Sequence, residues 1–155
     1  MGQRPTTHVR RRFQWCYVYG VVRPTTGESW WCLLPTVRTD AFALALAEFA
    51  RDETIDAAHR AVLVLDQAGW HLAAERRIPE GIDLVFLPAY SPELQPAERL
   101  WPLVNEAVAN QAVADLARLE DALVARCQSL RADRSTVRAH TRFHWWPDEP
   151  APIDN

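Results

Sequence analysis

The chain has 155 residues, of which 48% are hydrophobic and 24% charged, proportions ordinary for a globular protein of one domain. Its net charge is −3, which argues against a protein that coats DNA, so any contact with nucleic acid must be local. Three widely separated cysteines argue against a disulfide framework, and no apolar run is long enough to span a membrane, so we expect a cytoplasmic protein without a membrane partner.

The first part of the chain predicts a β-hairpin. The polar residues 1–12 end in Arg10, Arg11 and Arg12, which form either a solvated charge run or a phosphate-contacting patch. Aromatic and β-branched residues from Phe13 to Val22 predict a strand with both faces buried. A turn at residues 24–27 leads to the returning strand, Ser29 to Leu34.

A helix and a β-α-β unit are predicted next. Thr39 or Asp40 can cap a helix that reaches about Arg51. Its apolar stripe, at spacings of four and then three residues, is Phe42, Leu46 and Phe49.

Two short apolar runs follow, and each predicts a strand. Because a helix is predicted between them, we expect the two strands to be parallel. Ala61 to Leu65 is apolar throughout and predicts a strand buried on both faces, Gly69 to Arg77 predicts a short helix, and Asp83 to Leu87 predicts the second strand. With the hairpin and the helices, these elements predict an α/β fold.

The last part of the chain predicts helices and a tail. Pro96 suits the first position of a helix, whereas Pro102 should kink that helix or delay its start. A second amphipathic helix is expected from about Asp115 to Arg131. We expect one domain over residues 1–146 and a disordered tail over residues 147–155.

Two acids stand where an α/β protein often places catalytic groups. Asp66 directly follows the Ala61 strand, and Glu98 lies in the first turn of the helix from Pro96. Carboxylates that meet in this way suit a Mg²⁺ site for phosphodiester chemistry. From spacing alone, two local roles stay open: Asp66 could cap the following helix, and Glu98 could stabilise the start of its own.

A long motif connects these acids to a known family. Residues 87–101 read LPAYSPELQPAERLW. They resemble the signature Leu-Pro-x-Tyr-Ser-Pro-x-Leu-Asn-Pro-x-Glu-x-x-Trp of the mariner-type DDE transposases, specifically the bacterial insertion-sequence branch. His71 matches a histidine that follows the family's second acid. Gln67 and Gln95 depart from it, because the family usually has Asn or Gly at the first position and Asn at the second.

The resemblance implies a ribonuclease-H-like fold, a mixed sheet flanked by helices. It implies that Asp66 and Glu98 are catalytic and metal-binding, with Asp66 bridging two Mg²⁺ or Mn²⁺ ions and Glu98 binding one. It implies DNA as the partner, both element ends and target, a homo-oligomer when active, and association with the bacterial nucleoid. The supporting residues it suggests are His71, Gln67, Tyr90, Ser91 and Gln95.

One part of the family pattern has no match. The family's first catalytic Asp lies on a central strand, between this hairpin and the Ala61 strand, and we find no corresponding position in the chain. We therefore expect a partial catalytic domain, inactive alone and competent when the upstream part of the transposase supplies that Asp. The alternative is an inactive remnant, or a regulator that binds DNA or a transposase partner.

Overall fold

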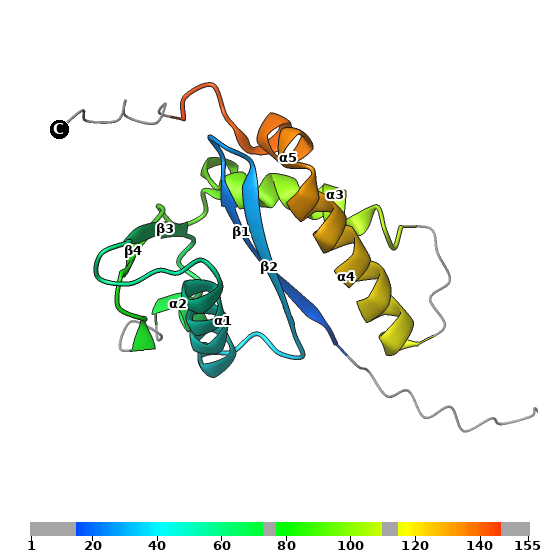
Figure 1. Ribbon diagram of the computed structural model, residues 1–155, viewed down its shortest axis with the longest axis horizontal. Helices are drawn as coiled ribbons and strands as arrows, with labels where there is room; N and C mark the ends of the chain where they lie inside the picture. The colour runs from blue at the N-terminus through cyan, green and yellow to red at the C-terminus, as the bar shows by residue number, and fades with distance from the viewer. Residues whose placement is uncertain (1–14, 73–76, 110–114, 147–155) are drawn as a thin grey trace, which may run out of the picture.

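The computed structural model describes residues 15–72, 77–109 and 115–146, so Arg10, Arg11, Arg12 and the expected tail lie outside the described residues. The protein is a mixed α/β structure (Figure 1). Its elements are β1 (Tyr17–Arg23), β2 (Glu28–Leu34), α1 (Thr39–Asp52), β3 (Ala61–Leu65), α2 (Gly69–Leu72), β4 (Ile82–Phe86), η2 (Pro92–Leu94), η3 (Pro96–Arg99), α3 (Leu100–Asn105), α4 (Leu116–Ala132) and α5 (Arg134–Thr141).

The predicted hairpin is confirmed and forms the centre of the molecule. β1 and β2 pair antiparallel along their full length, from Tyr17 opposite Leu34 to Arg23 opposite Glu28. The turn between them needs Gly27, whose φ is +75° and whose hydrogen faces the Arg134 carbonyl oxygen, so a side chain there would collide with the start of α5.

Each face of the hairpin packs against a different group of elements, because successive side chains of a strand point in opposite directions. Figure 1 shows α1, β3 and β4 on one side and α3, α4 and α5 on the other. The first core gathers the apolar stripe of α1 around Trp30, with Leu63 and Ile82 from the second sheet. The second core is formed by residues of α3, α4 and α5, namely Leu100, Leu103, Val104, Leu123, Cys127, Leu130 and Val137. The predicted packing of the first strand on both faces is confirmed, since Tyr19 and Val21 pack against the first core and Val18 and Val22 against the second, but these residues are half-buried.

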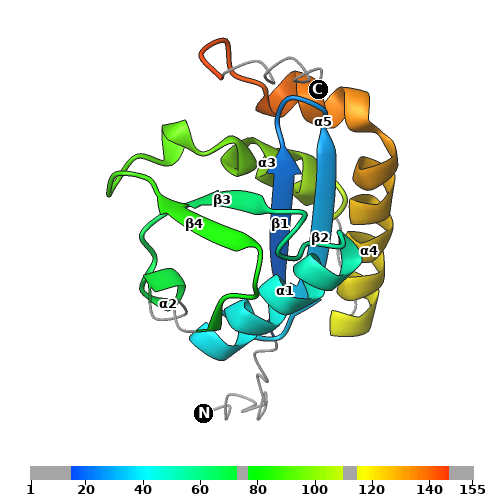
Figure 2. The same cartoon turned by 60° about the vertical axis from the view of Figure 1, so that its left-hand side comes forward.

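β3 and β4 form a separate parallel sheet, with Ala61 opposite Ile82 and Leu65 opposite Phe86. Its strands run in a different direction from the hairpin in Figure 2, and no strand pairing joins the two sheets in the described part of the chain. The prediction that the Ala61 strand is buried on both faces is wrong. Val62 is 61% exposed and Val85 49% exposed, because only the opposite face of this sheet packs into the core.

The helix starts differ in how well the sequence predicted them. Asp115 caps α4 as expected, with its carboxylate accepting from the Arg118 N–H at 2.9 Å. Neither Thr39 nor Asp40 caps α1: the cap residue is Arg38, and its side chain makes no capping bond. The predicted end near Arg51 is confirmed, since α1 ends at Asp52.

Pro102 delays the helix after the proline-rich turn, as the sequence indicated. Pro96 opens only the 3₁₀ turn η3, and the α-helix α3 begins at Leu100. A proline cannot donate to the carbonyl four residues earlier and its ring crowds that carbonyl, so an α-helix cannot run through Glu98 to Pro102. Glu98 therefore lies on a 3₁₀ turn and not on an α-helix.

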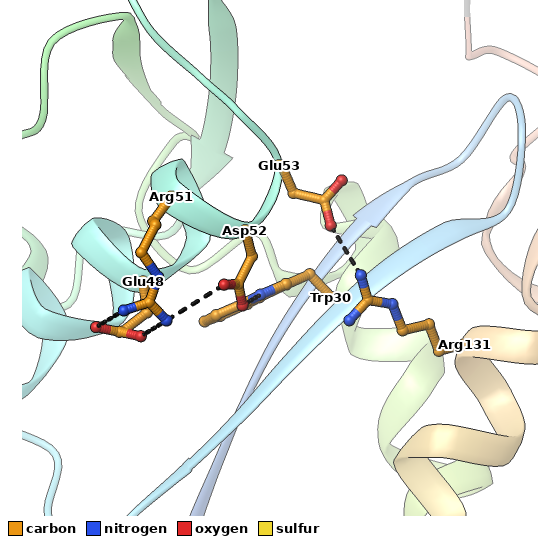
Figure 3. A network of polar contacts seen from close by, with 6 residues as sticks. All are labelled: Trp30, Glu48, Arg51, Asp52, Glu53 and Arg131. Atoms are coloured by element: carbon orange, nitrogen blue, oxygen red, sulfur yellow. Dashed lines mark hydrogen bonds and ion pairs between the residues drawn. The ribbon is translucent and has the colours of Figure 1, made fainter.

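Polar contacts at the end of α1 tie this helix to the hairpin and to α4 (Figure 3). The Trp30 indole N–H donates to Asp52 at 3.1 Å, and this bond is the main cause of the lowered pKa of Asp52. Arg131 of α4 pairs with Glu53 at 3.2 Å. Arg51 also contacts both Asp52 and Glu48. In the described ranges, the helices are all too short or too polar to cross a membrane.

Candidate active site

The carboxyl ends of β3 and β4 lie at the same edge of their sheet because the strands run parallel. Asp66 directly follows β3, and Leu87 directly follows β4. The Gln67 side-chain amide donates to the Leu87 carbonyl oxygen at 2.9 Å, while the Leu87 N–H donates to Leu65 at 2.8 Å. Gln67 therefore fastens the start of the proline-rich turn beside Asp66.

His71 holds the Asp66 carboxylate by one of its two oxygens. The His71 Nδ1 atom lies 2.7 Å from Asp66 Oδ1 and 3.3 Å from the Asp66 carbonyl oxygen. Because both facing groups are acceptors, Nδ1 is the ring nitrogen that carries a proton. The Ala68 N–H donates to the same Oδ1 atom at 3.2 Å. Oδ2 has no hydrogen-bond partner among the described residues, and the Asp66 side chain is 55% exposed.

Packing fixes the position of the His71 ring. Its centroid lies 4.4 Å from that of Phe42 on α1, and the Trp70 ring meets it edge-on at 5.8 Å. The His71 side chain is only 13% exposed. The Ala68 bond is the local turn contact that the spacing of Asp66 left open, and it leaves Oδ2 available for a ligand.

The proline-rich turn presents an exposed aromatic ring. Tyr90 is fully exposed and has a φ of +59°, in the left-handed region that costs a non-glycine residue about 1–2 kcal/mol. The Ser91 hydroxyl donates to the Ala89 carbonyl at 3.4 Å. Gln95 contributes its backbone, which accepts from the Glu98 N–H at 3.1 Å. The Tyr90 ring is not needed to stabilise the turn, since its full exposure means that it packs against none of the described residues.

Glu98 is exposed, and its carboxylate makes no hydrogen bond or ion pair with a described residue. Nothing joins it to Asp66, and the described residues contain no group of three or more His, Cys, Asp or Glu side chains that could hold a metal ion. The structure thus brings together Asp66, His71 and, through Gln67, the start of the turn that leads to Glu98. It does not bring Glu98 into direct contact with them.

The oxygens of two separate carboxylates have the chemistry of ligands for a hard cation. Asp66 Oδ2 and the Glu98 carboxylate are the oxygen ligands that Mg²⁺ and Mn²⁺ prefer. Sequence reasoning missed Phe42 and Trp70, the rings that position His71. In the sequence, Phe42 is part of the apolar stripe of α1, which indicates core packing, and Trp70 is only an aromatic residue next to the histidine.

The family model for the DDE superfamily endonuclease matches residues 1–120. The uncharacterized protein y4pE/y4sA of Sinorhizobium fredii is 41% identical over 92 residues, which cover 59% of this chain and 67% of that protein. No solved structure matches the chain.

The chain therefore belongs to the DDE superfamily endonuclease family, as the motif at residues 87–101 indicated. Membership indicates a transposase-type function, with DNA as the partner and divalent metal ions as the usual cofactors of such domains.

Proposed function

We propose that the chain supplies two of the metal-binding carboxylates, Asp66 and Glu98, of a ribonuclease-H-like transposase domain that cleaves DNA and transfers the cut strand. The observation that carries the proposal is the Asp66 carboxylate at the end of β3, held through Oδ1 by His71 and open at Oδ2. The motif that begins at Leu87 supports it, because Gln67 fastens that motif beside Asp66 and the motif continues to Glu98.

A third carboxylate is expected to come from a strand outside the described residues. Among the described residues, β1 pairs only with β2 and β3 only with β4, so in that part of the chain each sheet has an edge that could accept another strand. A strand inserted between β1 and β3 would join the two sheets into one mixed sheet and would end beside Asp66. This is the place that the first Asp of the family requires.

The residues of this chain would prepare the site for metal-assisted cleavage. Bound divalent ions supply an activated water or hydroxyl nucleophile and neutralise charge on the leaving oxygen. The His71 N–H fixes the rotation of the Asp66 carboxylate, which keeps Oδ2 directed away from the local turn. Glu98 offers the second carboxylate from the 3₁₀ turn η3, which starts at Pro96.

The proposal is tested by nicking of plasmid DNA that carries the element ends. The chain is mixed with the upstream segment that supplies the missing Asp and with Mg²⁺ or Mn²⁺. We expect this mixture to nick the plasmid. Replacing a residue that only supports a metal ligand typically lowers activity by roughly 10- to 100-fold, so Asp66→Asn and Glu98→Gln, which change the ligands themselves, should each lower the nicking rate by more than that. Glu93→Gln is the matched control, because Glu93 is an exposed acid in η2 of the same turn.

A non-catalytic regulator is the second candidate function. The free edges of β1 and β3 favour it, because an edge strand can pair with a strand of a partner transposase without any chemistry. A regulator predicts partner binding with no nicking under any metal. Nicking that survives the combined Asp66→Asn and Glu98→Gln substitutions would reject the proposed active site.

A further inference from the structure

An open pocket lies where the start of α1 meets α2, next to the residues that hold Asp66. It has a volume of about 470 Å³ and is lined by Arg38, Thr39, Asp40, Gly69, Trp70 and Arg77. Trp70 in the pocket wall contacts His71, and His71 contacts the Asp66 carboxylate, so two side-chain contacts connect the pocket to Asp66. We call it the Arg38–Trp70 pocket.

The charges in the pocket favour an anion. Two arginines and one aspartate line it, which leaves one net positive charge. Arg38 pairs with Asp40 through its Nε atom at 3.4 Å, and its side chain is 71% exposed, so its guanidinium is accessible to a ligand. Arg77 is exposed and has no ion pair with any described residue. A planar guanidinium with free N–H groups suits a phosphate oxygen pair.

The aromatic wall of the pocket favours a base. Trp70 is 39% exposed, and it meets the His71 ring at an interplanar angle of 76°. An edge-on contact of this kind leaves the indole with a face that another ring can stack on. Arginines beside an exposed aromatic ring are the combination that binds single-stranded nucleic acid.

We propose that the Arg38–Trp70 pocket binds one nucleotide of a DNA strand, with its phosphate on Arg38 and Arg77 and its base on Trp70. The pocket thereby holds the strand beside Asp66. The inference rests on the proposed function for the choice of DNA as the ligand.

The test is the binding of a fluorescent single-stranded DNA of about 16 nucleotides, the upper size of a single-stranded binding site, titrated with salt in the presence of EDTA. We expect Arg38→Gln and Arg77→Gln each to weaken binding and to lower the slope of log K against log salt by about 0.7. Trp70→Ala should weaken binding roughly 5- to 150-fold without changing the slope, and Trp70→Phe should restore part of it.

Matched controls lie elsewhere on the surface. Arg118→Gln and Trp145→Ala change an exposed arginine and a 45% exposed tryptophan that do not line the pocket, and both should bind as the unsubstituted chain does. A thermal melt of each variant shows that it is folded. Competition with a free nucleoside monophosphate separates a strand site from a nucleotide site, and displacement of DNA at equal concentration would overturn the strand proposal.

Failure of the inference is distinguishable from failure of the proposed function. No DNA binding in EDTA, or pocket variants that bind with unchanged affinity and slope, would overturn the pocket even if the chain nicks DNA. Retained binding by Asp66→Asn together with the expected pattern of pocket variants would uphold the pocket even if no nicking is found.

Discussion

His71 lies between an aromatic ring and a carboxylate, and the two contacts have different consequences. Phe42 fixes where the imidazole is, and the Nδ1–H group fixes how the Asp66 carboxylate is rotated. In the function proposed above, Asp66 is a metal ligand, and replacing a side chain that supports such a ligand typically changes metal affinity by roughly 10- to 100-fold. The effect of His71 on metal binding should therefore be separable from its effect on packing.

We predict that His71→Leu, which keeps an apolar body against Phe42 but has no donor, weakens Mn²⁺ binding by roughly 10- to 100-fold. His71→Gln, which keeps a donor, should lose less. The measurement is calorimetric titration of Mn²⁺ into the chain, with thermal unfolding of each variant recorded alongside. If both variants bind Mn²⁺ as tightly as the unsubstituted chain does, the His71 contact is a packing feature without influence on the carboxylate.

At this scale the sequence predicts which acids are candidates for the site, but it does not describe their surroundings. Asp66 and Glu98 stand out because each follows a recognisable local pattern, the end of an apolar strand and the start of a proline-led turn. His71 and Ala68 both contact the Oδ1 atom of Asp66, and this could not be predicted from residue spacing. The His71 position depends on the contact of its ring with Phe42, which lies on α1.

The joint between α4 and α5 depends on a single side chain. Asp133 ends α4 and begins α5, and its carboxylate accepts from the Thr136 N–H at 3.1 Å and from the Ser135 hydroxyl at 2.8 Å. Hydrogen bonds from the Thr136 side chain, the Thr136 N–H and the Ser135 hydroxyl lower the pKa of Asp133 from 3.8 to about 2.

The lowered pKa of Asp133 predicts a loss of stability in acid. A depressed pKa means that the charged form is favoured in the folded state, so its contribution is fully present above about pH 4 and disappears as the pH falls to about 2. Asp133→Asn keeps a capping side chain but does not titrate. We expect the melting temperature of the unsubstituted chain to fall further than that of Asp133→Asn between those two pH values.

The check is thermal unfolding followed by circular dichroism at several pH values. The remaining carboxylates are common to both chains, so the difference between the two pH profiles isolates Asp133. Parallel profiles would show that the carboxylate is no better bonded in the folded chain than in the unfolded one.

The elements that the sequence predicted are those with a strong apolar pattern. The hairpin, α1, β3, β4 and α4 each carry such a pattern. α5 does not: its buried residues are only Val137 and Thr141, so no stripe marks it, and its helix depends on the Asp133 cap and on contact with its neighbours. The exposure of Val62 was missed for the converse reason, because an apolar run indicates a buried strand whether or not a neighbour covers its second face.

At the scale of the molecule, two sheets share a core without sharing a hydrogen bond in the described part of the chain. Trp30 of the hairpin and Leu63 and Ile82 of the second sheet pack with α1 in one cluster, so the sheets are held together by side chains. Sequence reasoning could place each strand but could not say that the sheets stay separate, because that depends on whether a further strand lies between them.

The hydrogen-bonding groups of β3 show which edge such a strand would use. Ala61 donates to Gly81, and Leu65 accepts from Leu87, so the odd-numbered residues of β3 face β4. Since the N–H and C=O groups of neighbouring residues point to opposite edges of a strand, those of Val62 and Val64 point away from β4. These are the groups that an added strand would bond.

We predict that the Val62 and Val64 amides exchange with solvent faster than the Leu63 and Leu65 amides in the chain alone. Addition of the upstream segment should slow Val62 and Val64 while leaving Leu63 and Leu65 nearly unchanged. The measurement is residue-resolved hydrogen exchange, and Leu63 and Leu65 serve as internal controls on the same strand. Val62 and Val64 amides that are already protected in the chain alone would mean that this edge is covered. Restored DNA nicking without their protection would mean that the third carboxylate arrives by another route than strand addition at β3.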